Sequence, residues 1–249
     1  MHPPLSGQSI LVTGGARRVG AAIARRLHAA GASIALHYRS SQAEAAALAV
    51  ALNAERPGSA AIFAADLLDI AALNAMVSAV RQHFGRLDAL VNNASSFFPT
   101  PLGQIDEAAW NDLVGSNFKA PLFLAQAAAP YLAERGGAIV NITDIHAERP
   151  LPGYPLYSAA KGALLTLTRA LAIELGPKVR VNAVAPGAIL WPEDGQLPGP
   201  ERRDIIEHTL LKREGAPDDI AGAVYFLLAE ATYMTGQVLN IDGGRTAHL

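Results

Sequence analysis

Short apolar runs, many of them rich in β-branched residues, alternate along the chain with longer stretches rich in alanine and leucine. Runs that are apolar on both faces are typical of parallel strands covered by helices on each side. Such runs stand at residues 9–12, 33–37, 60–64, 87–91, 138–142, 179–184 and 237–241. Helical patterns stand between them at residues 19–30, 43–54, 69–84 and 157–175. The alternation predicts an α/β fold in which a doubly wound parallel sheet of about seven strands carries helices on both faces.

The domain organisation follows from what is missing between these runs. A length of 249 residues fits either one large α/β domain or two small ones. No linker rich in proline, glycine or serine divides the sequence, and no internal repeat is visible. Its only irregular stretch dense in proline lies at residues 186–200 and suits a loop over a binding site. We therefore expect a single domain over residues 1–249, with a substrate loop near residues 186–210.

Composition and charge exclude several functional classes. The 20 basic and 22 acidic side chains give a net charge of −2, too weak a field for a nucleic-acid or membrane surface. The sequence has no cysteine, and its histidines lack metal-ligand spacing, so we expect no metal. The first seven residues do not read as a signal peptide, and the longest uncharged apolar stretch, residues 120–133, is too short to span a membrane. A cytoplasmic protein is expected.

A glycine-rich segment, TGGARRVG at residues 13–20, joins the first predicted strand to the first helix. Glycines at this junction let the backbone turn sharply and approach a pyrophosphate at the positive end of the helix. We expect cofactor contacts from Gly14, Arg17, Arg18 and Val19. An ordinary glycine-rich turn is the alternative.

The second predicted strand ends in His37, Tyr38, Arg39 and Ser40. A site selective for NAD would place an acid here to bind the ribose 2′-hydroxyl. Arg39 and Ser40, helped by His37, instead offer positive charge and a hydroxyl to a 2′-phosphate. The segment predicts NADPH as the cofactor, and a solvated strand end is the alternative.

Tyr157 and Lys161 stand four residues apart in a helical pattern, so both point from one face. A phenol with a pKa of about 10 is poorly matched to proton transfer at neutral pH. A lysine ammonium about 4 Å away would lower that pKa by up to about three units. Such a pair also occurs on ordinary amphipathic helices, but its position downstream of the glycine-rich segment favours catalysis.

These motifs resemble, in order and over nearly the whole chain, the short-chain dehydrogenase/reductase family. The glycine-rich segment is similar to its Thr-Gly-x-x-x-Gly-x-Gly signature, with Arg18 in place of the middle glycine. The resemblance implies a Rossmann-type fold, an oxidoreductase activity and a homotetramer with the helix of Tyr157 at one interface, where Gly162 and Ala163 would permit close packing. It also makes Asn117 a catalytic residue that supports Lys161. Further cofactor contacts are implied for Asp66, Leu67, Asn93, Ala94, Thr143, Lys161, Pro186 and Gly187.

Asp66 could equally be the N-cap of the following helix. Asn93 and Ala94 follow a strand, and open parallel sheets bind ligands at that edge.

Asp144 departs from the family, which places a serine thirteen residues before the tyrosine. A carboxylate beside a ketone would repel the developing oxyanion. A carboxylic acid, kept protonated by burial, suits a substrate whose ring nitrogen must gain a proton. The alternative is a solvated strand-end residue in an inactive protein.

The segment at residues 37–40, the run NNASSFFPTPL at residues 92–102 and Arg18 resemble the pteridine reductases of this family. In that reading Ser95 bonds a pterin edge, and Phe97 stacks on the ring. Arg18 bridges pyrophosphate and pterin, while Asp144 and Tyr157 supply a proton. The sequence thus predicts NADPH-dependent reduction of a dihydropterin, biopterin or dihydrofolate. A ketone reductase, such as one acting on 3-oxoacyl thioesters, and a non-catalytic NADPH-binding protein are the alternatives.

Overall fold

A parallel sheet of seven strands forms the centre of the protein, as predicted. The computed structural model describes residues 3–190 and 199–247. Neighbouring strands are parallel throughout, in the order β3-β2-β1-β4-β5-β6-β7. Their bounds are β1 (Ser9–Val12), β2 (Ser33–Tyr38), β3 (Ala60–Ala64), β4 (Ala89–Asn92), β5 (Ala138–Ile142), β6 (Arg180–Pro186) and β7 (Val238–Ile241).

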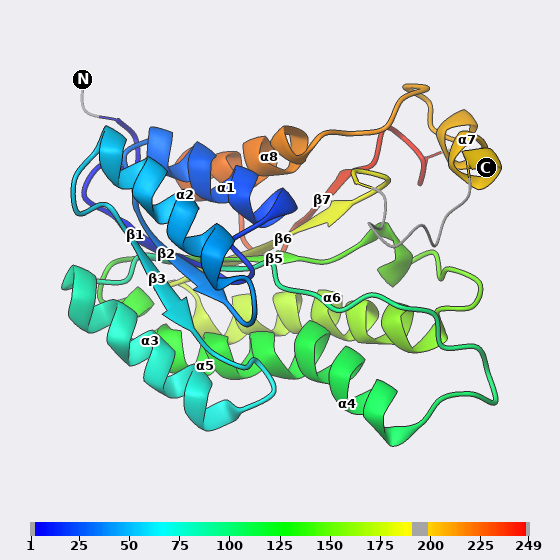
Figure 1. The fold of residues 1–249 in the computed structure, drawn as a ribbon, viewed down its shortest axis with the longest axis horizontal. Coiled ribbons are helices and arrows are strands. Elements are labelled where there is room, and N and C mark those ends of the chain that lie inside the picture. The colour runs from blue at the N-terminus through cyan, green and yellow to red at the C-terminus, as the bar shows by residue number, and fades with distance from the viewer. Residues whose placement is uncertain (1–2, 191–198, 248–249) are drawn as a thin grey trace.

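Helices cover both faces of this sheet. They are α1 (Arg18–Ala29), α2 (Gln42–Glu55), α3 (Ile70–Phe84), α4 (Glu107–Val114), α5 (Ala120–Ala133), α6 (Pro155–Leu175), α7 (Gly199–Glu207) and α8 (Pro217–Ala229). Figure 1 shows α1, α2 and α8 on one face and α3, α4, α5 and α6 on the other. The doubly wound arrangement expected from the sequence is confirmed.

Four of these helices, α4, α5, α7 and α8, were not predicted by the hydrophobic pattern. Helix α5 packs against both α3 and α6, and it is apolar around most of its circumference. A helix buried on several sides lacks the polar stripe that reveals an amphipathic helix. Helix α8 packs closely against α1 and is also largely apolar, so its sequence likewise lacks a clear polar stripe.

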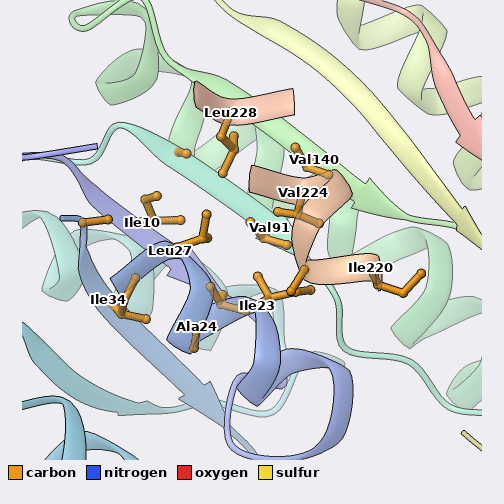
Figure 2. Packing of buried hydrophobic residues seen from close by; sticks show 14 of the residues in the cluster. Ile10, Ile23, Ala24, Leu27, Ile34, Val91, Val140, Ile220, Val224 and Leu228 are labelled. Atoms are coloured by element: carbon orange, nitrogen blue, oxygen red, sulfur yellow. The ribbon is translucent and has the colours of Figure 1, made fainter. Parts of the chain in front are cut away.

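The core on the α1 side fixes the sheet against two helices. Figure 2 shows side chains of α1 and α8 meeting those of the central strands. The labelled residues are Ile10, Ile23, Ala24, Leu27, Ile34, Val91, Val140, Ile220, Val224 and Leu228. Buried aliphatic packing of this kind stabilises the relative position of strands and helices.

The strand order reverses at β1. This strand pairs with β2 on one side and with β4 on the other, so successive connections leave in opposite directions. Open α/β sheets bind ligands outside the carboxyl ends of the strands at such a point. Among the described residues, no helix is long and apolar enough to cross a membrane.

Candidate active site

A cavity of about 1230 Å³ runs along the carboxyl edge of the sheet. Every site residue predicted from the sequence lines it, except Asn117. These residues are Gly14, Arg17, Arg18, Val19, His37, Tyr38, Arg39, Ser40, Asp66, Leu67, Asn93, Ala94, Ser95, Phe97, Thr143, Asp144, Tyr157, Lys161, Pro186 and Gly187. The fold therefore brings together segments that are far apart in the sequence.

The glycine-rich loop between β1 and α1 is shaped by close backbone contacts. Gly14 has a φ of +60°, and a Cβ on Gly20 would lie 2.1 Å from the Gly14 carbonyl oxygen, so no larger residue fits. Arg17 precedes α1 without a side-chain cap, and the first turn of that helix carries no acid. The N–H groups at the start of α1 thus suit an anionic ligand.

Thr13 ties this loop to the segment after β4. Its hydroxyl oxygen accepts hydrogen bonds from the backbone N–H groups of Asn93, at 2.9 Å, and Ala94, at 3.0 Å. The Asn93 amide in turn donates to the carbonyl oxygens of Thr13, at 2.9 Å, and Gly14, at 3.2 Å. Asn93 therefore holds the loop in place.

Arg18 occupies the family's glycine position with a φ of +52°, in the left-handed region that favours glycine. Its guanidinium donates to the carbonyl oxygen of Leu190 at 3.4 Å, which links the glycine-rich loop to the segment after β6. A strained residue that lines a cavity is a candidate for a ligand contact.

His37 does not carry the positive charge expected of it. The ring is buried, its Nδ1 accepts the Gly14 N–H at 3.0 Å, and its Nε2 lies 3.1 Å from the Ala65 carbonyl oxygen. A ring whose Nδ1 accepts must be neutral and donate through Nε2. Burial also lowers the pKa of His37, so this expectation was wrong and the residue is a support for the loop.

The cationic end of the cavity consists of the arginines around β2. Arg17 lies 3.7 Å from the carboxylate of Glu44, with both side chains about half exposed. In the part of the chain that the structure describes, no carboxylate pairs with Arg39. Arg39 and Ser40 adjoin the cavity directly after β2, an arrangement that fits a phosphate.

Asp66 lies beside this end, after β3. Its carboxylate accepts the backbone N–H of Leu68 at 3.0 Å. The N-cap of α3 is Asp69, which accepts from the N–H groups of Ala71, at 2.8 Å, and Ala72, at 3.2 Å. The N-cap alternative for Asp66 was therefore wrong.

Tyr157, on α6, donates a hydrogen bond from its hydroxyl to Oδ2 of Asp144 at 2.7 Å. The other oxygen of Asp144, Oδ1, accepts the N–H of His146 at 2.8 Å and caps a short 3₁₀ turn, Ile145–Ala147. Lys161 donates from Nζ to the Ile142 carbonyl oxygen at 2.9 Å. Three of the four predicted catalytic side chains thus meet at the end of β5.

Electrostatics at this point differ from the prediction. Burial, followed by the neighbouring Asp144 carboxylate, raises the pKa of Tyr157 well above its ordinary value. Burial lowers the pKa of Lys161 to about 8. The expectation that Lys161 lowers the pKa of Tyr157 was wrong, because the phenol contacts the carboxylate while the ammonium bonds a carbonyl. Tyr157 is therefore protonated at neutral pH, as a proton donor must be.

Asn117 lies behind the cavity in a π-helical turn, Gly115–Lys119. Its Oδ1 accepts the hydroxyl of Ser95 at 2.7 Å, and its Nδ2 donates to the carbonyl oxygens of Ser96, at 2.9 Å, and Leu113, at 3.0 Å. The described contacts of its side chain thus hold the segment after β4, whereas support of Lys161 was expected.

Phe97 already has an aromatic neighbour. Its ring stacks on Tyr154, with centroids 4.6 Å apart and planes at 11°, and meets Tyr157 edge-on at 4.8 Å. One of its two faces is thus covered by protein. Tyr154 was not predicted as a site residue, although it stands one helical turn before Tyr157.

Two further parts of the cavity wall contain residues that were not predicted as site residues. Residues of the expected substrate loop, Ala188 to Leu190, line the cavity together with Asp204 and Ile205 of α7. Residues 191–198 of that loop lie outside the described residues. Arg245, after β7, also lines the cavity, and only the preceding Asp-Gly-Gly motif marked its position in the sequence.

Comparisons with known proteins agree with this geometry. A family profile described as "Enoyl-(Acyl carrier protein) reductase" matches residues 14–246. Pteridine reductase 1 of Leishmania tarentolae is 40% identical, with 94% of each chain covered. A 3-oxoacyl-(acyl-carrier-protein) reductase of Staphylococcus aureus is 35% identical over 95% of this chain and 97% of its own. A crystal structure of a blue fluorescent protein from a metagenomic library in complex with NADPH has 38% identity and a TM-score of 0.90, and covers 97% of this chain and 99% of its own.

The fold and the Tyr157–Lys161 pair define an oxidoreductase with a nucleotide-binding sheet. The family profile matches nearly the whole chain, and the relatives cover nearly all of it, so the family itself can be stated. The chain belongs to the short-chain dehydrogenase/reductase family.

The strain at Arg18 is separable from its contacts. Glycine accepts a φ of +52° without a Cβ penalty, so Arg18→Gly should raise the free energy of unfolding by up to about 1 kcal/mol relative to Arg18→Ala. Urea denaturation of both variants measures this difference. Equal stability of the two would show that position 18 carries no strain.

The buried ammonium of Lys161 costs stability at neutral pH. Its pKa of about 8 lies below the ordinary 10.5, so the penalty on the folded state is complete below pH 8 and fades as the pH rises to 10.5. Lys161→Met should raise the free energy of unfolding by up to about 3 kcal/mol at pH 7, and by much less at pH 10.5.

Chemical denaturation at both pH values checks this, with exposed Lys178→Met as the control. A gain for Lys161→Met that does not change with pH would contradict the assigned pKa.

Proposed function

We propose that this oxidoreductase is a pteridine reductase, which uses NADPH to reduce a dihydropterin such as dihydrobiopterin, or dihydrofolate. The hydrogen bond between Tyr157 and Asp144 carries the proposal. It places a carboxyl group beside the proton-donating phenol, where many carbonyl reductases of the family have a serine.

The residues present suit NADPH. Gly14 and Gly20 leave a close approach for a pyrophosphate, and Arg39 with Ser40 offers charge and a hydroxyl to the 2′-phosphate. Lys161, with Asn93, Ala94, Thr143, Pro186 and Gly187, would hold the nicotinamide half. When bound, NADPH supplies the hydride. The structural relative bound to NADPH has the same fold over nearly its whole length.

In the proposed reaction a hydride adds to the carbon of a ring C=N bond, and a proton adds to its nitrogen. The π bond breaks, one C–H and one N–H bond form, and NADP⁺ remains. Asp144 is partly exposed to solvent, whereas Tyr157 is buried and stays protonated. Together they deliver one solvent-derived proton to the ring nitrogen.

The ring itself would lie against the aromatic pair. Tyr154 stacks on Phe97 and Tyr157 meets the same ring at a steep angle, which fixes Phe97 beside the proton donor, where its ring would contact a pterin. The hydroxyl of Ser95 donates to Asn117, and Ser95 also hydrogen-bonds the Tyr157 side chain, so it lies beside the proton donor, where it would contact a pterin amino group. Arg18, at the glycine-rich loop, would reach both the pyrophosphate and the ring.

A ketone reductase is the second candidate. Tyr157 and Lys161 suit either reaction, and a 3-oxoacyl reductase stands among the relatives at comparable identity. Asp144 argues against it, because a carboxylate at 2.7 Å from the phenol oxygen would repel an oxyanion formed there. A non-catalytic NADPH-binding protein would not need this pair of a phenol and a carboxyl group.

Removal of either proton donor should slow the chemistry. Tyr157→Phe and Asp144→Asn should each lower kcat for dihydrobiopterin by about 10²- to 10⁴-fold, because general acid catalysis contributes that much. The NADPH absorbance at steady state measures it. Tyr233→Phe, at a fully exposed tyrosine, is the matched control.

Parallel assays with an acetoacetyl thioester distinguish the candidates. Preference for the thioester would favour the ketone reductase, and tight NADPH binding without any turnover would favour the non-catalytic protein. Saturable binding of a methotrexate-type antifolate in the presence of NADPH is the further result that a pteridine site requires.

We further propose a cytoplasmic homotetramer in which α6 forms one interface. Gly162 and Ala163 are partly exposed there and allow close approach of a second helix, and the apolar Ile173 is 80% exposed on the same helix. Ala163→Arg should convert the tetramer into smaller species in sedimentation velocity. Val50→Arg, at an exposed position of α2, should not. A monomeric wild-type protein would refute this assembly.

A further inference from the structure

A second cationic element lies at the far end of the main cavity. Arg245, four residues beyond β7, is partly buried and lines the cavity that also contains Asp144 and Tyr157. Across residues 3–190 and 199–247, no carboxylate or carbonyl oxygen pairs with its guanidinium. The reaction described above does not use this charge.

The turn that presents Arg245 is firmly built. The carboxylate of Asp242 accepts the N–H of Gly244 at 2.9 Å, and the N–H and hydroxyl of Thr246 at 2.8 and 2.6 Å. Burial raises the pKa of Asp242, but these hydrogen bonds outweigh it and the net pKa is lowered. Arg149 adds a bond from its guanidinium to the Thr246 carbonyl oxygen at 3.0 Å. The backbone on both sides of Arg245 is therefore fixed before any ligand arrives.

Arg245 is too far from the cofactor phosphates to serve them. Five strand spacings separate β2, which Arg39 directly follows, from β7. Neighbouring strands lie about 4.8 Å apart, which gives roughly 24 Å. The start of α1 follows β1, only one strand nearer. An anion bound at Arg245 must belong to another molecule in the same cavity, and that molecule is the substrate.

The other ionisable groups nearby have partners of their own. Asp204 of α7 lines the cavity, but its carboxylate lies 3.5 Å from Nδ1 of His208. His146 lines it too, and its Nδ1 lies 2.9 Å from the Arg149 carbonyl oxygen. Among the described residues that line this end of the cavity, Arg245 is thus a cation whose guanidinium donors have no protein acceptor.

We propose that Arg245 binds a carboxylate at the end of the substrate remote from the reacting ring. A guanidinium and a carboxylate form two parallel hydrogen bonds, which fix both position and orientation. The inference rests on the proposed pteridine reduction and narrows it: the site favours a dihydropterin with an acidic tail, such as dihydrofolate, over one with a neutral side chain, such as dihydrobiopterin.

Binding of two ligands tests this without requiring turnover. Folate carries two carboxylates, whereas biopterin carries none. Titration of the protein with each ligand at saturating NADP⁺, followed by quenching of protein fluorescence, gives the two dissociation constants. In Arg245→Met, the ratio of folate affinity to biopterin affinity should fall by roughly 10- to 100-fold, because bonds to a charged group are lost. The ratio for Arg245→Lys should lie between those of the wild type and Arg245→Met, since lysine keeps the charge and loses the paired hydrogen bonds.

Arg213→Met is the matched control, since it removes an equal charge from a nearby segment that does not line this cavity. Arg213→Met should leave the ratio of folate affinity to biopterin affinity unchanged. A fall as large as that in Arg245→Met would show that the effect comes from long-range charge and would overturn the carboxylate site. Added salt should lower the ratio in the wild type and leave Arg245→Met unaffected.

Kinetics separate this inference from the reaction on which it rests. If dihydrofolate and dihydrobiopterin are both reduced, the ratio of their kcat/KM values should change among the variants in the same direction as the ratio of folate affinity to biopterin affinity. In another outcome, folate binds in preference to biopterin in an Arg245-dependent way while neither dihydrofolate nor dihydrobiopterin is reduced. That result would refute the pteridine reduction and retain the carboxylate site. An unchanged ratio in Arg245→Met would overturn the carboxylate site while leaving the reduction intact.

Discussion

The parallel pairing of β1 with both β2 and β4 is the constraint on which the rest of the site depends. With the other parallel pairings it directs every strand the same way, so the segments after the strands meet at one edge although residues 14 and 245 stand at opposite ends of the sequence. The hydroxyl of Thr13 then joins the segments after β1 and β4 through two backbone N–H groups. Because the sheet and its aliphatic core are rigid, each segment can carry a different chemical group without disturbing the others.

Burial at the end of β5 has opposite effects on two neighbouring groups. It keeps the phenol of Tyr157 protonated and makes the ammonium of Lys161 easier to neutralise. The carboxylate of Asp144 is less buried and meets both the phenol and a backbone N–H. A phenol that holds its proton therefore lies next to a carboxyl group that solvent can reach.

The sequence predicted the sheet and most of the cavity wall, because strands buried on both faces and glycines at a strand–helix junction leave local patterns. It did not predict α5, whose several buried sides remove the polar stripe, nor Tyr154, whose contact with Phe97 joins residues of separate elements. The directions of the pKa shifts were also out of reach. They depend on the depth of Tyr157 and on which oxygen Lys161 meets, and residue spacing reveals neither.

The position of His37 has a consequence for the acid tolerance of the cofactor loop. Gly14 has its N–H satisfied by Nδ1 of the neutral imidazole, and a protonated ring has no lone pair with which to accept it. Uptake of a proton would thus turn an attraction into a repulsion at the first glycine of the loop. Because burial lowers the pKa of His37, that event is displaced toward more acidic solution. The loop can therefore keep one shape when the pH of a near-neutral solution changes slightly, even though a histidine supports it.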